Sequence, residues 1–456
     1  MSNFLFDKLS SKIKGELLYF DEDLRSYCSD KSYLKGIVPS VIVKAVCKED
    51  VKEVLSFANN YKISVTVRGA GSGKSGGAIP EFKGIVLSLE KMNKILDVDP
   101  NNLCIVVEPG VILDDIKKTV LIHNLFYPVE TSSSDWCTIG GNVAENAGGA
   151  NSLKYGVTAD YVLALEGYFA DGTFFKLGRR CHKDVAGYNL KDLLVGSEGT
   201  LGIITKITLK LIPKPKCMVS FWCQFDSMKK AVDFLARTRL SGINFSAAEF
   251  MEPDCLEAAE NYLQKSFDFT SGYGVLLAYD NDTSESISYV ADFLEKMIIS
   301  HPYNGKLFTE PTTSFWEVRR SISEALAFQY KNKFSEDITI PISSISIYFD
   351  FIKSIQTSSI KLVGYGHLGD GNIHTNLLNL DLEETIWNQE KERLIDKLMN
   401  YCVSIGGTLT GEHGIGLTKK KYMNLYFTDF EIALMKQIKK QVDPNLILNP
   451  SKMFND

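Results

Sequence analysis

Two glycine-rich segments in the C-terminal half of the chain hold three of its six histidines. The first, Gly364–Asn376, contains His367 and His374, and the second, Gly411–Gly416, contains Glu412 followed by another histidine. Imidazole and carboxylate ligands together suit zinc, manganese or a similar divalent ion. His367 and His374 flank a Gly-Asp-Gly turn, so both rings can point into one pocket with Glu412 as a third ligand. Three protein ligands and an open position are typical of a catalytic metal site. The alternative is that these histidines are bonded to backbone in turns.

A second chemical signal is the run RGAGSGKSGGA, Arg68–Ala78, which directly follows the β-branched segment Ile63–Val67. Backbone amides with little side-chain bulk around them form a nest for phosphate oxygens. The run also matches the glycine fingerprint of dinucleotide-binding folds, but that motif needs a helix to follow it. Here Pro80 and the strand-like segment Gly84–Leu89 follow instead. An ordinary glycine-rich turn remains the alternative.

Three further segments rich in Gly, Ser, Thr and Asn are bounded by apolar runs: Pro128–Gly149, Gly187–Leu190 and Gly196–Gly202. Such loops can bring backbone close to a flat, polar and extended ligand. Together with the phosphate nest, they indicate a pyrophosphate-linked cofactor.

A carboxylate substrate would require a cation, preferably the planar and bidentate guanidinium of arginine. Arg319 is a candidate, because it stands in Trp316-Glu-Val-Arg319 just before the helical stretch Ile322–Phe328. Exposed helix arginines are common, so a solvated helix face is the alternative.

The composition excludes several classes of protein. The 456 residues include 50 Lys+Arg and 56 Asp+Glu, a net charge of −6, and no basic run exceeds Lys419–Lys421. A nucleic-acid partner is therefore not expected. Nine scattered cysteines without a Cys-x-x-Cys pair favour reduced thiols and argue against an iron–sulfur cluster or zinc ribbon in this chain. No apolar stretch reaches the length of a membrane span. We expect a cytoplasmic protein, with peripheral attachment to a membrane still compatible with an amphipathic N-terminus.

The elements that must position these residues follow from periodicity. Helices are expected at 50–61, 113–124, 228–238, 287–297 and 384–405, after a helical lead-in at 1–36. Strands are expected at 63–67, 84–89, 103–107, 201–212, 218–225, 273–279, 345–355, 360–365 and 374–378, with a hairpin over 163–177 turning at Asp171-Gly172. The Pro213-Lys-Pro215 break marks a domain boundary. The strand–helix units after it favour an α+β domain built on an antiparallel sheet with helices on one face.

The glycine-rich segments and the two histidine motifs together resemble the FAD-linked oxidases of the vanillyl-alcohol oxidase/para-cresol methylhydroxylase (PCMH) fold. The resemblance covers roughly residues 36–456, including the closing Leu448–Lys452, and is greatest to the branch of D-2-hydroxy-acid dehydrogenases and oxidases. It implies an α+β fold, with a PCMH-type FAD-binding domain of two α+β subdomains and an antiparallel-sheet cap domain. The expected boundaries are 1–35 for the lead-in, 36–215 for the FAD domain, 216–410 for the cap, and 411–456 for a segment returning to the FAD domain.

The resemblance also implies which residues contact FAD. The phosphate run supplies Arg68, Gly69, Ala70, Gly71, Ser72, Gly73, Lys74, Ser75, Gly76 and Gly77. The rest of the cofactor would be lined by Glu130, Ser132, Ser133, Thr138, Gly140, Gly141, Asn142, Gly148, Gly149, Glu198, Gly199, Ile203 and Asn449. Some relatives attach flavin to a histidine beside the phosphate loop. Ala70 and its neighbours offer none, so FAD is expected to be non-covalent.

For the substrate side, the resemblance implies His367, His374 and Glu412 as metal ligands, with zinc or manganese as the ion. It also makes His413 the base. Arg319 becomes the carboxylate clamp, and the expected further contacts are Ser323, Lys333 and Asn376. Lys333 differs in spacing from the corresponding lysine of relatives.

The implied activity is oxidation of a small D-2-hydroxy acid, D-lactate or glycolate first, to the 2-oxo acid. Electrons would pass to a quinone, an electron-transfer flavoprotein or a separate iron–sulfur subunit, and a homodimer is compatible with the sequence. The alternatives are a D-2-hydroxyglutarate dehydrogenase, a redox-neutral transferase like alkylglycerone-phosphate synthase, and a non-catalytic flavin-binding subunit.

Overall fold

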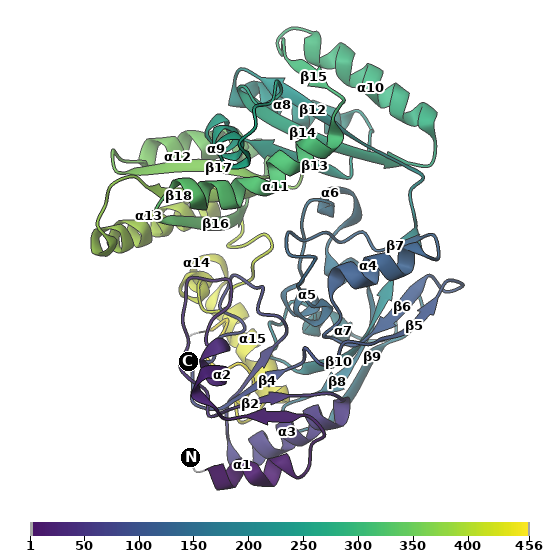
Figure 1. The fold of residues 1–456 in the computed structure, drawn as a ribbon, viewed down its shortest axis with the longest axis vertical. Helices are drawn as coiled ribbons and strands as arrows, with labels where there is room; N and C mark the ends of the chain where they lie inside the picture. Colours follow the sequence, from purple (N-terminus) through teal and green to yellow (C-terminus); the bar gives the residue numbers. More distant parts are fainter. Residues whose placement is uncertain (1–2, 455–456) are drawn as a thin grey trace. The chain divides into compact units, whose positions relative to one another are not determined.

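The computed structural model describes residues 3–454, in two compact units (Figure 1). The first unit comprises Met1–Gly148, Val157–Lys214 and Glu412–Asp456. The second comprises Gly149–Gly156 and Pro215–Gly411. Each unit therefore draws on segments that are distant in the sequence. No helix in the described range is both long and apolar enough to cross a bilayer.

The first unit contains a four-stranded sheet in the order β1 (Glu16–Leu18), β2 (Val41–Lys44), β4 (Ile85–Ser88) and β3 (Val65–Arg68). β2 and β3 run parallel to β4, and α3 (Lys48–Tyr61) connects β2 to β3. Parallel strands need such a crossover. The apolar face of α3 packs in one core cluster with residues of these strands.

The second sheet of this unit has five antiparallel strands in the order β5 (Ile95–Asp99), β6 (Cys104–Val107), β10 (Ile203–Lys210), β8 (Val162–Tyr168) and β9 (Phe174–Gly178). The expected hairpin is confirmed, because β8 pairs with β9 across Asp171-Gly172. The other elements of the unit are α1 (Asn3–Ser10), α2 (Asp21–Ser26), α4 (Leu113–Leu121), β7 (Leu125–Phe126), α5 (Ile139–Glu145), η1 (Thr158–Tyr161), α7 (Leu190–Leu194), β11 (Ile212–Pro213), η3 (Lys420–Tyr422), α14 (Met423–Tyr426) and α15 (Asp429–Val442). β7 and β11 pair as a further two-stranded sheet, so the unit combines three sheets with helices.

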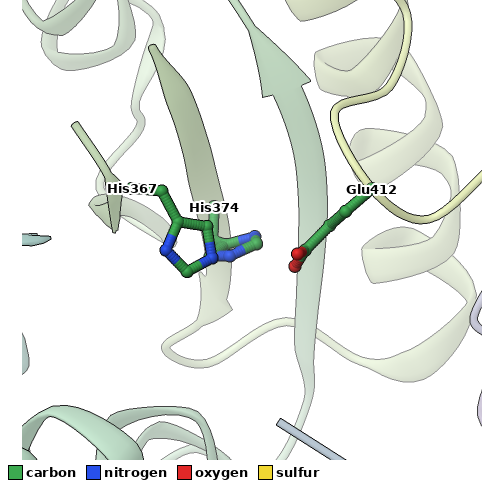
Figure 2. Close-up of side chains that lie close together, drawn as sticks. All are labelled: His367, His374 and Glu412. Atoms are coloured by element: carbon green, nitrogen blue, oxygen red, sulfur yellow. The ribbon is translucent and has the colours of Figure 1, made fainter. Parts of the chain in front are cut away.

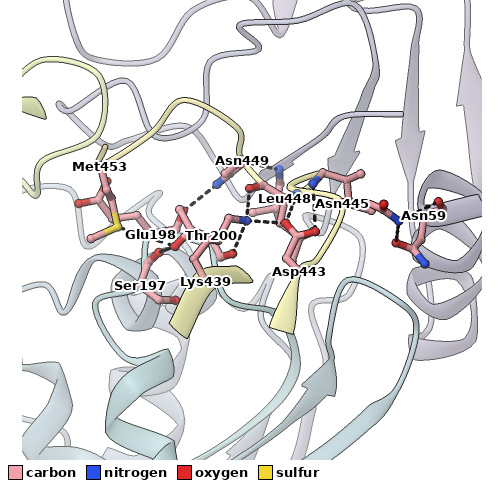
Figure 3. Close-up of polar contacts among 12 residues, drawn as sticks. Asn59, Ser197, Glu198, Thr200, Lys439, Asp443, Asn445, Leu448, Asn449 and Met453 are labelled. Carbon is pink, nitrogen blue, oxygen red and sulfur yellow. Dashed lines mark hydrogen bonds and ion pairs between the residues drawn. The ribbon is translucent and has the colours of Figure 1, made fainter. Parts of the chain in front are cut away.

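The C-terminal segment completes the first sheet. Leu448 forms a parallel bridge with Val65 of β3. Lys439 of α15 donates to the carbonyls of Thr200 (2.7 Å) and Leu448 (2.8 Å), and it pairs with Asp443 (Figure 3). These bonds connect α15, the segment after it and the loop before β10.

The second unit is built on one seven-stranded sheet. Its order is β15 (Lys306–Phe308), β12 (Cys217–Phe225), β14 (Tyr273–Asn281), β13 (Ala247–Met251), β17 (Ile360–His367), β18 (Asn372–Asn379) and β16 (Lys333–Thr339). Every neighbouring pair is antiparallel, as expected. Its helices are α6 (Ser152–Tyr155), α8 (Met228–Leu240), α9 (Pro253–Leu263), α10 (Ser284–Ile299), α11 (Thr312–Gln329), η2 (Ile342–Ser344), α12 (Ile345–Ile355) and α13 (Glu384–Ser404).

Helices cover both faces of this sheet, whereas the sequence pattern favoured one face. α9 and α11 share a core cluster with Val363 and Tyr365 of β17. Gly364 lies between these two residues, so its side-chain position faces the opposite side of the sheet. A Cβ there would meet Phe349 of α12. The antiparallel sheet is confirmed, and the placement of its helices is corrected.

Two expected elements differ from the structure. Residues 345–355, expected as a strand, form helix α12, whose buried side chains are Ile345, Tyr348, Phe349 and Ile352. The lead-in at 1–36, expected to be helical, also contains β1, which pairs with β2. In both places the tertiary partner determines the local conformation.

Candidate active site

Several of the segments expected to bind the cofactor converge within the first unit, whereas Gly149 belongs to the second unit and residues 187–190 are exposed. The glycine-rich loop leaves the end of β3, and a Cβ on Gly69 would lie only 2.2 Å from Oγ1 of Thr138, the residue before α5. Asn449 joins two more segments: its Oδ1 accepts from the backbone N–H of Val67 (3.1 Å), and its Nδ2 donates to the carbonyl of Glu198 (2.7 Å; Figure 3). Residues from four regions of the sequence thus form one cradle.

The cradle contains buried polar atoms that fit a polar cofactor. Within the described residues, Ser75 Oγ, Thr138 Oγ1, Asn142 Nδ2 and Glu145 Oε2 are buried without a hydrogen-bond partner. Buried polar atoms in proteins are ordinarily bonded, so four such atoms in one place need an explanation. The phosphates, ribose and ring heteroatoms of FAD would supply the partners. The residues present therefore fit FAD.

Three charged side chains lie at the cradle: Glu198 and Lys452 are buried, and Glu145 is partly buried with its Oε2 atom inside. Glu198 accepts the backbone N–H groups of Ile415 and Gly416, each at 2.7 Å. Burial, together with the charge of Glu198, raises the pKa of Glu145 well above its ordinary value. Burial also lowers the pKa of Lys452 to about 7. Lys452 donates to the carbonyl of Gly77, so a titratable cation lies directly under the phosphate loop.

Other expected cofactor residues have partners of their own or lie in the core. The Arg68 guanidinium donates to the carbonyl of Ser29 (2.8 Å) and lies over the ring of Tyr27. These contacts anchor the start of the glycine-rich loop to the segment that contains Tyr27 and Ser29. Glu130 pairs with Lys117. Ile203 packs in the core cluster. Lys74 is exposed, and Ser133 accepts two backbone N–H groups in a turn. The convergence described above therefore involves a subset of the expected residues.

The expected metal ligands gather at the end of the β17–β18 hairpin. His367 is the last residue of β17, His374 lies on β18, and Glu412 directly follows Gly411, the last residue of the second unit. One ligand atom from each of the three lies within 4.8 Å of the other two (Figure 2). Two imidazole nitrogens and a carboxylate oxygen form a donor set that suits zinc or manganese.

Asp337 fixes the chain next to Glu412. Its Oδ2 accepts from the Thr410 hydroxyl (2.8 Å) and the Gly411 N–H (2.9 Å), and its Oδ1 accepts from Asn372 (2.6 Å). Asp337 is fully buried on β16, beside His374 in the register of β18. A buried carboxylate therefore ties the segment before Glu412 to the strands that carry the histidines.

Arg319, the expected carboxylate clamp, is bonded to a buried glutamate. Nε and Nη2 of Arg319 lie 2.7 and 2.6 Å from Glu249 Oε2, and His367 Nδ1 lies 2.7 Å from Glu249 Oε1. Burial alone would raise the pKa of Glu249, but Arg319 and His367 outweigh it, and the pKa lies below its ordinary value. Glu249 is thus an anion in the interior.

The remaining expected substrate contacts lie on the same sheet and on α11. Lys333 of β16 donates to the hydroxyl (2.9 Å) and carbonyl (2.7 Å) of Ser323, one turn after Arg319 on α11. Asn376 donates to the carbonyl of His374 (2.9 Å), and its buried Oδ1 has no hydrogen-bond partner among residues 3–454. Nε2 of His413, the expected base, lies 3.8 Å from Oε1 of Glu412.

Sequence reasoning missed the roles of four charged residues around these sites: the buried Glu249, Asp337 and Lys452, and the partly buried Glu145. One signal was available for Glu249, because a charged residue in the apolar strand Ala247–Met251 can be buried only with partners. The partners themselves are 70 and 118 residues away in the sequence.

Comparison with known families agrees with this geometry. Residues 39–178 match the model for an FAD binding domain, and residues 214–453 match that for the C-terminal domain of FAD linked oxidases. The chain therefore belongs to the FAD-linked oxidases.

Relatives narrow the class. D-lactate dehydrogenase from Anaerostipes hadrus is 31% identical, with 98% of this chain and 97% of the relative covered. Glycolate oxidase subunit GlcD from Bacillus subtilis is 34% identical, with 96% and 92% covered. The solved structure of p-cresol methylhydroxylase with substrate bound has a TM-score of 0.82 at 16% identity over 99% of this chain and 96% of that one, a likeness of fold. Within its family, the chain is an FAD-linked hydroxy-acid dehydrogenase or oxidase.

Proposed function

We propose that the chain oxidises D-lactate or glycolate to the corresponding 2-oxo acid, with a divalent ion, zinc or manganese, held by His367, His374 and Glu412. The observation that carries the proposal is the grouping of these three ligand atoms within 4.8 Å. Relatives named D-lactate dehydrogenase and glycolate oxidase subunit support these two substrates.

In this proposal the protein's own residues bind and deprotonate the substrate. Arg319 binds the carboxylate through a guanidinium fork, a geometry that suits two carboxylate oxygens. Asn376, Ser323 and Lys333 are the further substrate contacts. His413 takes the proton of the substrate hydroxyl, since imidazole titrates near neutral pH.

The two bound groups supply the rest of the chemistry. A divalent ion held by His367, His374 and Glu412 would supply Lewis acidity toward the substrate hydroxyl. FAD held by the cradle would supply the ring that accepts hydride. We propose that FAD is non-covalent and bound by the cradle residues of the first unit.

We further propose the domain assignment 36–215 for FAD binding, 216–410 for the substrate cap, and 411–456 for a segment returning to the FAD domain, after a lead-in at 1–35. The division of the chain near Lys214 and Gly411 supports this assignment. We expect a cytoplasmic enzyme, or one attached peripherally to a membrane, that passes electrons to a quinone, an electron-transfer flavoprotein or a separate iron–sulfur subunit. A homodimer is compatible with this proposal.

D-2-Hydroxyglutarate is the second candidate substrate. A relative named probable D-2-hydroxyglutarate dehydrogenase, from Oryza sativa subsp. indica, is 31% identical over 89% of this chain and 73% of its own length. A structural neighbour, alkyldihydroxyacetonephosphate synthase, has a TM-score of 0.76 at 19% identity over 99% of this chain and 85% of that one, a likeness of fold alone.

An anaerobic flavin-reduction screen tests the proposal. The FAD-loaded protein is mixed with glycolate, D-lactate, L-lactate and D-2-hydroxyglutarate, and bleaching of the visible flavin band is followed in time. We expect the fastest bleaching with D-lactate or glycolate and none with L-lactate. Bleaching only by D-2-hydroxyglutarate would select the second candidate, and no bleaching by any 2-hydroxy acid would refute both.

A further inference from the structure

Glu249 is the side chain that connects the proposed clamp to the proposed metal site. It lies on β13 with none of its surface exposed. Its Oε2 accepts two N–H groups of Arg319, and its Oε1 lies 2.7 Å from Nδ1 of His367. Each carboxylate oxygen therefore serves a different partner.

The topology accounts for this arrangement. β13 and β17 are antiparallel, with Phe250 opposite Gly366, so the register sets Glu249 beside His367. α11 packs on the same face of the sheet and brings Arg319 to the other side of the carboxylate. Both contacts are thus long-range consequences of strand pairing and helix packing.

The bond to Glu249 determines the protonation pattern of His367. An ionised carboxylate can only accept hydrogen bonds, so the close contact requires the hydrogen of the ring to be on Nδ1. With the hydrogen on Nδ1, Nε2 is the ring nitrogen whose lone pair would bind a metal ion. Carboxylates commonly orient metal-binding histidines in this way.

The same carboxylate orients Arg319. Nε and Nη2 are directed at Glu249, while the guanidinium lies over the ring of Tyr365, 4.9 Å from its centroid. A guanidinium has five N–H groups, and these contacts use two of them. The plane of the guanidinium is fixed, and its remaining donors can still bind a substrate carboxylate.

We propose that Glu249 is a positioning residue that sets, with one carboxylate, both the tautomer of the metal ligand His367 and the orientation of the clamp Arg319. This inference rests on the proposed function. It implies that metal binding and substrate-carboxylate binding weaken together when Glu249 is changed. If Glu249 only neutralised the charge of Arg319, changing Glu249 would not weaken metal binding and substrate-carboxylate binding together.

Glu249→Gln tests the proposal because it keeps the shape of the side chain but removes one acceptor oxygen. The amide cannot accept from both His367 and Arg319. On full-length, FAD-loaded protein we expect zinc affinity, measured by chelator competition, to fall about 10–100-fold. We expect the KM for D-lactate or glycolate, whichever reduces the wild type, to rise about tenfold.

Glu252→Gln is the matched control. Glu252 is also buried and ion-paired, but its partners are Lys353 (2.8 Å) and the backbone N–H of Gly364 (2.6 Å). This variant should leave zinc affinity and KM within twofold of the wild type, while any loss of thermal stability should resemble that of Glu249→Gln.

The outcomes separate the inference from the proposed function. A wild type that binds neither zinc nor manganese and is not reduced by 2-hydroxy acids refutes the proposed function before any variant is compared. A wild type with metal and activity, but a Glu249→Gln variant with unchanged zinc affinity and KM, overturns the inference. If Glu249→Gln does not fold, Glu249→Asp replaces it, with smaller losses of the same two properties expected; no loss of either would overturn the inference.

Discussion

The histidines can be separated by function because the proposed ligands and the proposed base occupy different positions in the chain. His374 is buried on β18, whereas His413 follows Glu412 in a loop. We expect His374→Ala to lose the divalent ion and most turnover while keeping the flavin spectrum. We expect His413→Ala to keep the ion and lose a general-base factor of about 10²–10⁴ in turnover. Elemental analysis and steady-state kinetics on both variants check this.

The pH dependence of His413→Ala provides the second comparison. Hydroxide can replace a missing base, so the rate deficit should shrink as the pH rises. A metal-free wild type with full activity would contradict the ligand assignment. His182→Ala serves as the control, because His182 is an exposed histidine bonded to the carbonyl of Asn102.

The charge cluster under the phosphate loop predicts pH-dependent FAD binding. Burial lowers the pKa of Lys452 to about 7, and Asp30, Glu198, Glu81 and Glu145 oppose this shift. The pyrophosphate of FAD should raise that pKa again, so binding favours the protonated lysine. FAD affinity should therefore be greatest below pH 7 and fall as the pH rises through and above that value.

Calorimetric titration of the apo-protein with FAD at pH 8 measures the effect. Buffers of different ionisation enthalpy should reveal proton uptake on binding, and Lys452→Met should reduce that uptake. Equal affinity at pH 6.5 and 8.5 would show that Lys452 does not sense the pyrophosphate.

Local motifs can be recognised in the sequence, but the long-range partners of buried residues cannot. The histidines and Glu412 could be proposed as ligands because glycine-rich segments containing imidazole and carboxylate are unusual. Glu249 could be connected to Arg319 only through the register of β13 and β17 and the packing of α11, which no local pattern encodes. Charge on a buried strand indicates that a partner exists but does not identify it.

Two glycines of the loop 68–78 allow the contribution of this loop to FAD binding to be tested with substitutions of different severity. Gly76 has a φ of +83°, and a Cβ there would lie 3.2 Å from the Cβ of Leu417. Gly76→Val should therefore strain the loop and yield unstable, largely flavin-free protein. A Cβ on Gly73 would fit without a clash, because the nearest atom to it would be Glu145 Oε1 at 4.0 Å.

Gly73→Ala should thus leave the apo-protein's thermal unfolding unchanged while weakening FAD binding by about 1–3 kcal/mol through contact with the cofactor. Flavin fluorescence titration and thermal unfolding of apo-protein measure both effects. Full FAD affinity in both glycine variants would mean that the loop is an ordinary turn.

Helix α15 provides a stability prediction. Lys439 is buried and bonds Asp443 and the carbonyls of Thr200 and Leu448 (Figure 3). Lys439→Met removes the cationic partner of the buried Asp443, although the backbone N–H groups of Ile447 and Leu448 still donate to it. The free energy of unfolding should therefore fall by about 3–5 kcal/mol. The exposed neighbour Lys440 is the control, since Lys440→Met should change it by at most about 0.5 kcal/mol. Urea denaturation at saturating FAD measures the free energy of unfolding of the two variants. Equal values for Lys439→Met and Lys440→Met would contradict a stabilising role for the bonds of Lys439.

The one misassigned long element shows why element type can fail. Residues 345–355, which begin with Ile345-Ser-Ile-Tyr-Phe, are rich in β-branched and aromatic side chains, and this composition suggests a strand. The same segment places Ile345, Tyr348, Phe349 and Ile352 at i, i+3, i+4 and i+7, the period of a buried helix face. A short apolar run can therefore fit the period of a strand or that of a helix. In the structure it is a helix, and its Phe349 packs against Gly364 and Phe250. Helices such as α3 and α13, whose sequences support one period only, were predicted correctly.

For the whole molecule, FAD should be released intact on denaturation. None of the six histidines lies between Arg68 and Ala78, so the phosphate loop offers no imidazole for a covalent bond to flavin. Acid precipitation should leave FAD in the supernatant, identified by chromatography and mass spectrometry. Because bound FAD stabilises the folded state by mass action, FAD at 100 times its Kd should add about 2.7 kcal/mol to the free energy of unfolding. Flavin that stays on the precipitated polypeptide would contradict non-covalent binding.

The discontinuous first unit has a consequence for biosynthesis. Asn449, Lys452 and the Val65–Leu448 bridge belong to a segment that the ribosome makes after the roughly two hundred residues of Pro215–Gly411. At about 5–20 residues per second, the first part of the flavin unit waits roughly 10–40 s for this bridge and for Lys452. During that interval the edge of β3 lacks its partner, so the nascent chain should be a client of chaperones that shield strand edges. A ribosome stalled before residue 412 should carry a nascent chain that does not retain flavin.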